Sequence, residues 1–236
     1  MIAEFDVVFF DAGGTLFHAY PSVGQIYHGV ATRYGATCDP QSLDLVFREK
    51  WITHDGAQRT LAEPDLEAER LWWRALVHDV FSGFGGVPEF ETFFSELYPI
   101  FGTAAAWRVF PGVADTLAEL KRRGKRLGII SNWNENLPHL CSELGLADYF
   151  DVVVSSGSVG VAKPGARIFE TAMRAMEVEP HRAVHVGDSV RDDVEGARRT
   201  GLAGILIDRS ADRGDHEVLD GVPVIHDLAA LLEVEA

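Results

Sequence analysis

The sequence predicts an α/β fold, with helices on both faces of a parallel sheet and a block of helices inserted after the first strand. Three observations predict it. An almost wholly apolar run at residues 5–10 fits a strand covered on both faces. From residue 111 onward, short apolar runs alternate with helical patterns. Between these two parts, residues 17–108 carry helical patterns alone.

The first strand leads into a turn that contains a carboxylate and two glycines. Asp11 follows the apolar run directly, and Gly13, Gly14 and Thr15 come next. Ligands of parallel sheets bind beyond the carboxyl ends of the strands, and glycines allow the backbone to approach a ligand closely. Taken alone, this stretch fits equally well an Asp that hydrogen-bonds its own backbone.

The inserted block predicts four helices, over residues 21–34, 40–51, 66–81 and 87–101. Apolar residues recur at helical spacing, and turn-forming residues separate the segments. The block is rich in aromatic residues, which we expect to pack inside a small helical bundle. The glycine-rich stretch at residues 83–86 follows no clear strand and is not interpreted as a phosphate-binding loop.

The second part of the chain predicts strands and helices in alternation. Strands are expected over residues 126–132, 151–155, 183–187 and 204–207, and helices over 113–123, 137–144, 167–176, 192–200 and 227–232. Such alternation implies right-handed crossovers and a parallel sheet with helices on both faces.

Composition excludes several classes of partner. The 236 residues include 21 Lys and Arg against 36 Asp and Glu, for a formal net charge of −15. This balance argues against a nucleic-acid or membrane-surface partner, although a local metal ion could still attract a small phosphorylated molecule. Only two cysteines occur, without metal-ligand spacing, which argues against a disulfide framework. This favours a reducing, cytoplasmic location. No basic signal segment or apolar run of the ~20 residues that a membrane span needs is present.

Polar residues follow four of the predicted strands, where a parallel sheet would bring them to one edge. They are Asp11, then Ser131 and Asn132, then Lys163, and finally Asp188 with Asp192 and Asp193. A carboxylate can attack phosphorus, and Mg²⁺ prefers oxygen ligands such as carboxylates. A hydroxyl and an ammonium can stabilise charge on a phosphoryl group. The set therefore indicates phosphoryl chemistry.

The same four segments resemble the motifs of the haloacid dehalogenase-like (HAD) hydrolase superfamily. They are residues 11–16, 130–132, 163–164 and 187–193, in that order. Tryptophan-containing segments at residues 72–73, 107–109 and 131–133 look closest to one subfamily. That subfamily contains the haloacid dehalogenase-like hydrolase domain-containing protein 3 and the rhythmically expressed gene 2-like proteins.

The resemblance implies a Rossmann-like core domain of residues 1–16 and 109–236 and a helical cap domain of residues 17–108. It also implies roles for individual residues. Asp11 would be the nucleophile and Lys163 would steady it. Mg²⁺ would be held by Asp11, the Gly13 carbonyl and Asp188, with support from Asp193. The substrate would contact Ser131, Asn132, Gly14 and Thr15. Asp192 and Asp193 both fit the allowed spacing, and Asp193 is favoured because residues 194–197 then align better.

One position departs from the family pattern. Phosphatases of the family carry, two residues after the nucleophile, an Asp that acts as general acid and base, and this chain has Gly13 there. Such a group typically contributes about 10²–10⁴ in rate. We therefore expect a phosphohydrolase that prefers leaving groups needing no proton, and a gain on alkyl phosphates from Gly13→Asp. His18 is interpreted as structural or solvated, and His185 as structural.

Two alternatives remain. A 2-haloacid dehalogenase also needs no such acid, but carboxylates at residues 188 and 193 would repel an anionic haloacid. A non-catalytic protein that binds a phosphorylated metabolite is the other. The sequence leaves the substrate and the oligomeric state open.

Overall fold

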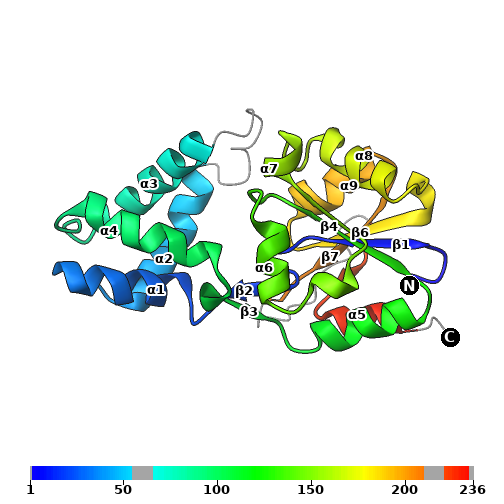
Figure 1. Ribbon diagram of the computed structural model, residues 1–236, viewed down its shortest axis with the longest axis horizontal. Coiled ribbons are helices and arrows are strands. Elements are labelled where there is room, and N and C mark those ends of the chain that lie inside the picture. The colour runs from blue at the N-terminus through cyan, green and yellow to red at the C-terminus, as the bar shows by residue number, and fades with distance from the viewer. Residues whose placement is uncertain (1, 55–65, 210–220, 234–236) are drawn as a thin grey trace. The chain divides into compact units, whose positions relative to one another are not determined.

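The computed structural model describes residues 2–54, 66–209 and 221–233 (Figure 1). The chain divides into two compact units. The first, here called the core unit, consists of Met1–Phe17 and Val109–Ala236, and the second, the helical unit, of His18–Arg108. Strands β2 (Phe17–Ala19) and β3 (Trp107–Val109) pair in a two-stranded sheet where the chain passes between the units.

The core unit is built on a six-stranded sheet whose strand order is β5-β4-β1-β6-β7-β8, and every neighbouring pair is parallel. The strands are β1 (Val7–Phe10), β4 (Arg126–Ser131), β5 (Val152–Ser155), β6 (Ala183–Gly187), β7 (Ala203–Ile207) and β8 (Val224–Ile225). The central strand β1 is fully buried, as its unbroken apolar sequence predicts. Its register places Phe10 opposite Ile129 and Val186, so the residues after β1, β4 and β6 meet at one edge.

Helices cover both faces of this sheet (Figure 1). They are α5 (Val113–Arg122), α6 (Leu137–Glu143), α7 (Ser156–Val159), α8 (Ala166–Ala175) and α9 (Gly196–Arg199). On one face, Ile168, Phe169 and Ala172 of α8 pack in a buried cluster with Val7 and Phe9 of β1. The predicted parallel α/β sheet with helices on both faces is confirmed.

Three details of the core unit differ from the sequence-based expectation. The predicted helix at 192–200 begins as a π-helical segment, Val190–Glu195, in which Val194 N donates to Ser189 O at 3.2 Å, and only then becomes α9. The predicted last helix is a 3₁₀ helix, Leu228–Leu232. Strand β8 and helix α7 were missed, because each is too short to show a periodic pattern.

The helical unit contains α1 (Val23–Ala31), α2 (Pro40–Thr53), α3 (Leu66–Ser82) and α4 (Phe90–Leu97). These correspond to the four predicted helices, and the chain after α4 continues as 3₁₀ helices at Tyr98–Gly102 and Ala104–Ala106. Aromatic side chains pack inside its core, as predicted, together with aliphatic ones. Tyr27 stacks on Phe81 with ring centroids 5.9 Å apart, and Phe93 meets Phe81 edge-on at 5.2 Å.

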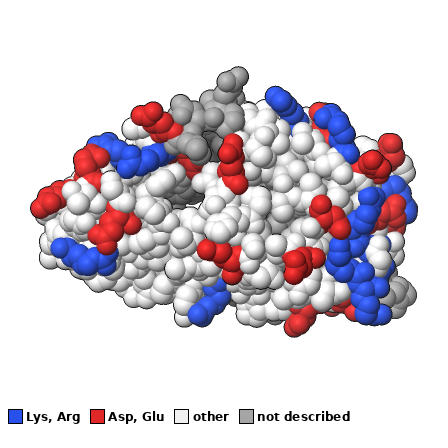
Figure 2. All heavy atoms as spheres, viewed as in Figure 1, with Lys and Arg blue, Asp and Glu red and all other residues white. Residues whose placement is uncertain are grey.

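Lysines and arginines crowd one short segment of the chain, residues 121–126, and most of them bind nearby carboxylates or carbonyls. Lys121 pairs with Asp151 at 2.9 Å, and Glu119 binds the two arginines that follow Lys121. Lys125 donates to backbone carbonyls near the N-terminus. Figure 2 shows Lys and Arg interspersed with Asp and Glu on the face it draws. None of the helices in the described ranges is long and apolar enough to cross a membrane.

Candidate active site

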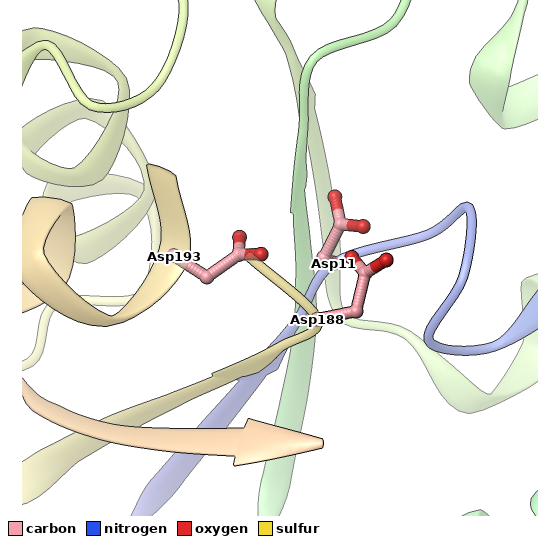
Figure 3. Close-up of side chains that lie close together, drawn as sticks. All are labelled: Asp11, Asp188 and Asp193. Carbon is pink, nitrogen blue, oxygen red and sulfur yellow. The ribbon is translucent and has the colours of Figure 1, made fainter. Parts of the chain in front are cut away.

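Three carboxylates converge at the carboxyl edge of the sheet (Figure 3). Asp11 follows β1, Asp188 follows the neighbouring strand β6, and Asp193 reaches toward them from the π-helical segment. One oxygen atom from each of the three lies within 4.8 Å of the others. The structure thus brings together the three acids that the sequence placed at this edge.

A buried lysine joins two of these acids. The Lys163 ammonium lies 2.6 Å from Asp11 Oδ1 and 2.6 Å from Asp193 Oδ1. Lys163 is only 3% exposed, so it neutralises two carboxylates in a region from which water is largely excluded. Burial would lower the pKa of this ammonium, but the two carboxylates outweigh burial and raise the pKa well above its usual range.

Asp193 has both of its oxygen atoms occupied by groups of the protein. Oδ1 accepts from Lys163 and from His185 Nε2, which is 2.8 Å away, and Oδ2 accepts from the Ser189 backbone N–H at 2.9 Å. Burial alone would raise the pKa of Asp193, but the charge of Lys163 and the His185 hydrogen bond hold it well below its usual range. The lowered pKa favours the charged form of Asp193, which holds the Lys163 ammonium in place.

His185 is a site residue that the sequence did not reveal. It lies in the apolar strand β6 and is fully buried, where burial lowers its pKa and keeps the imidazole neutral. A neutral ring facing a carboxylate donates through Nε2–H, so His185 supports Asp193. An isolated histidine among apolar strand residues carries no sequence signal for such a contact.

Asp188 differs from the other two acids because part of the residue is exposed to solvent, although its carboxylate lies against the turn at Gly14. The pKa of Asp188 is raised to about 7, first by the loss of water around the carboxylate and then by the charges of Asp11 and Asp193. Burial likewise raises the pKa of Asp11, against the opposing charge of Lys163. When its three carboxyls are ionised, the cluster carries more negative than positive charge, because Lys163 supplies the one ammonium that pairs with them among the described residues.

This donor set fits a hard divalent cation such as Mg²⁺, which prefers oxygen ligands and few carboxylates. Asp11 accepts a hydrogen bond from the Lys163 ammonium through Oδ1, at 2.6 Å. The Asp188 carboxylate faces the turn after β1, where a Cβ on Gly14 would collide with it. Gly14 also has a φ of 80°, a conformation that glycine adopts without strain. Asp11, Asp188 and the turn could therefore hold such an ion.

Asp192 and Asp193, which fit the spacing equally well, occupy different surroundings. Asp192 is not part of the three-carboxylate cluster, and its buried Oδ1 has no hydrogen-bond partner in the described part of the chain. Burial raises the pKa of Asp192 to about 6. Close packing also explains Gly187, since a Cβ there would overlap the Asp193 carboxylate.

Of the residues expected to contact substrate, Asn132 is engaged elsewhere. Its Nδ2 donates to Lys163 O at 3.1 Å, and its Oδ1 accepts from Lys163 N at 2.8 Å. Ser131 ends β4 and is 2% exposed, at the same edge as Asp11. Thr15 is buried, and its hydroxyl has no hydrogen-bond partner among the described residues. Contact of these residues with a substrate stays a prediction.

Arg209 is a second residue that the sequence did not point to. Its Nη2 donates to the Thr15 carbonyl at 2.6 Å, and its guanidinium lies 3.9 Å from the centre of the Phe110 ring. Burial lowers the pKa of Arg209 to about 10. The arginine therefore stabilises the turn that follows Asp11 through its hydrogen bond to the Thr15 carbonyl.

The chain belongs to the haloacid dehalogenase-like hydrolase family, whose model matches residues 5–201. Haloacid dehalogenase-like hydrolase domain-containing protein 3 of Xenopus laevis is 33% identical, over 85% of this chain and 83% of its own length. The rhythmically expressed gene 2 protein of Drosophila melanogaster is 26% identical, over 87% and 84%. These relatives confirm the superfamily and the subfamily that the sequence motifs indicated.

Relatives and solved structures with named activities also match. A glyceraldehyde 3-phosphate phosphatase of Methanothermobacter thermautotrophicus is 40% identical, over 55% of this chain and 60% of its own. The crystal structure of a HAD phosphatase from Thermococcus onnurineus aligns with a TM-score of 0.63 and 26% identity, covering 96% of both chains. An L-2-haloacid dehalogenase from Xanthobacter autotrophicus aligns with a TM-score of 0.72 and 22% identity, covering 96% of both, which shows a shared fold.

Proposed function

We propose that this hydrolase is a Mg²⁺-dependent phosphohydrolase that acts on a small phosphorylated metabolite through an aspartyl-phosphate on Asp11. The observation that carries the proposal is the arrangement around Asp11. Lys163 holds Asp11 Oδ1 at 2.6 Å, and a carboxylate oxygen of Asp11 lies within 4.8 Å of one from Asp188 and one from Asp193. The phosphatase relatives support the reaction class. A cytoplasmic location remains part of the proposal.

The reaction takes place in two displacements. An Asp11 carboxylate oxygen attacks phosphorus, and the bond from phosphorus to the leaving oxygen breaks with both electrons going to that oxygen. Water then attacks the acyl phosphate and releases inorganic phosphate and the free carboxylate. When bound, Mg²⁺ would be held by Asp11, Asp188 and the Gly13 carbonyl and would offset the negative charge of the phosphate.

The protein's own groups prepare the nucleophile. Lys163 favours the charged form of Asp11, which burial would otherwise disfavour. Asp193, which His185 holds in turn, fixes Lys163. The ammonium therefore does not need to reorient when charge develops on the phosphoryl group. We assign Ser131, at the end of β4, to the phosphoryl oxygens.

The absence of a side chain at Gly13 sets the expected substrate preference. Without an acid at that position, an alkoxide leaving group would depart unprotonated, which is slow. Aryl and acyl phosphates release stabilised anions and do not need this proton. We therefore propose higher activity on aryl or acyl phosphates than on alkyl phosphates.

The test is a panel of phosphate esters and 2-chloropropionate, each assayed with Mg²⁺ and with EDTA, on the wild type and on Asp11→Asn. We expect phosphate release that requires Mg²⁺ and Asp11 and is faster from aryl than from alkyl esters. Chloride release in EDTA would instead identify a dehalogenase. Tight phosphate binding with no turnover of any compound would identify a binding protein.

A further inference from the structure

An indole ring occupies the space beside Gly13. A Cβ atom built on Gly13 would lie 3.2 Å from Cζ3 of Trp133, which is closer than such contacts normally are. The Trp133 ring also meets the fully buried Phe17 edge-on, with centroids 5.7 Å apart and planes at 82°. Among the described residues that are not neighbours in the chain, the atom nearest to that Cβ position is therefore a ring carbon of a packed side chain and not a polar group.

The main chain around Trp133 is firmly held. Its N–H donates to Ser131 O at 3.0 Å, and its carbonyl accepts from the Gly157 N–H at 2.9 Å and from the Ser156 hydroxyl at 3.1 Å. A Cβ on Gly157 would lie 2.9 Å from the Asn134 backbone, so this loop packs closely against the start of α7. The main chain that carries the indole is thus fixed by the fold of the core unit.

Residue 13 lies within the site. It separates Asp11 from Gly14, and Gly14 faces the Asp188 carboxylate. A side chain that packs over Gly13 consequently lines the turn that follows Asp11 and faces Asp188. In this chain the space over Gly13 is filled by the apolar edge of an indole from a residue 120 positions away in the sequence.

We infer that Trp133 is a specificity-determining residue that selects phosphate esters whose leaving group is a delocalised oxyanion, such as a phenolate or an enolate. The inference rests on the proposed phosphohydrolase function. The indole edge offers a planar, apolar contact to such a leaving group. The ring carbon gives no proton to an alkoxide, and it packs tightly against the place of a side chain at position 13.

This geometry changes the expectation for Gly13→Asp. From sequence alone, that substitution should increase activity on alkyl phosphates. A Cβ at residue 13 would lie 3.2 Å from the Trp133 ring, so the indole must move by a few tenths of an ångström to admit the new side chain. Gly13→Asp alone should therefore gain little, and the gain should appear when Trp133 is also made small.

The test compares the wild type, Trp133→Phe, Trp133→Ala, Gly13→Asp and the double variant Gly13→Asp/Trp133→Ala. The readouts are kcat and KM with Mg²⁺ for phenyl phosphate and glycerol phosphate, and circular dichroism checks that each variant is folded. We expect Trp133→Ala to lower kcat/KM for phenyl phosphate about tenfold, mainly through KM, with little change for glycerol phosphate. Trp133→Phe keeps an aromatic edge and should retain most of the wild-type kcat/KM for phenyl phosphate.

The double variant gives the second readout. It should hydrolyse glycerol phosphate about 10²-fold faster than Gly13→Asp alone. Equal effects of Trp133→Ala on both esters, or equal activity of Gly13→Asp and the double variant, would overturn the inference while leaving the phosphohydrolase proposal intact. A wild type that hydrolyses neither ester with Mg²⁺ would overturn the proposed function and this inference with it.

Discussion

Replacing Lys163 with methionine is the most direct test of the charge arrangement at the site. Methionine keeps much of the length and apolar volume of lysine but removes the ammonium that lies 2.6 Å from both Asp11 and Asp193. Both carboxylates would then be buried without their counter-charge. Lys121→Met is the matched control, because Lys121 pairs with Asp151 at 2.9 Å but both side chains are more than a third exposed.

The two substitutions should differ several-fold in their effect on stability. Breaking a buried ion pair by removing one partner costs about 3–5 kcal/mol. An exposed pair such as that of Lys121 contributes about 0.2–1 kcal/mol, because water and salt screen it. The measurement is the free energy of unfolding in urea, with EDTA present so that no metal replaces the missing charge.

The difference between Lys163→Met and the wild type should also depend on pH. In the wild type the pKa of Asp193 is lowered, so its stabilising contribution is complete above the unfolded carboxyl pKa of about 4 and is lost as pH falls toward the folded value. In the variant, burial without Lys163 raises the pKa of the carboxyls. The cost should therefore be larger at about pH 8 than at about pH 5. A cost equal to that of Lys121→Met, or one independent of pH, would refute the buried pairing.

Three further predictions concern the rest of the core and the helical unit. His185→Phe removes a hydrogen bond to a charged carboxylate and should cost about 1.5–3 kcal/mol in urea unfolding, and His185→Gln should recover part of it because an amide can donate; equal losses would contradict this role. Gly128→Ala should cost about 1–3 kcal/mol, because the new Cβ would lie 2.8 Å from neighbouring side chains in the sheet. Gly29→Ala meets open space in α1 and should stabilise the protein by about 0.5–1 kcal/mol. A lower melting temperature for Gly29→Ala than for Gly128→Ala would contradict this packing. Burial raises the pKa of Cys38 and raises that of Cys141 to about 12, so neither thiol should react with DTNB in the folded protein and both should react after denaturation.

The sequence predicted what depends on local pattern. The apolar run before Asp11 marked a buried central strand, and alternation after residue 111 marked the parallel sheet. Because parallel strands end at a common edge, the meeting of Asp11, Asp188 and Asp193 could be expected without coordinates.

The remaining features depend on side-chain direction and on contacts between distant segments. Asp193 meets His185 from a π-helical segment, a winding that no periodic pattern in the sequence indicated. The pairing of Gly13 with Trp133 links two loops that are far apart in sequence. Spacing alone also could not distinguish Asp192 from Asp193, whereas the winding of the backbone does.

The two hydrogen bonds between Asn132 and Lys163 have a consequence for how this site can change. The Asn132 side chain binds the main-chain N–H and carbonyl of Lys163, and neither of these hydrogen bonds involves the lysine side chain. The loop is therefore anchored in a way that is indifferent to which amino acid stands at that position. A substitution at 163 that removes the ammonium therefore keeps both hydrogen bonds to Asn132, and the cost in stability comes from the unpaired carboxylates and not from a loosened loop.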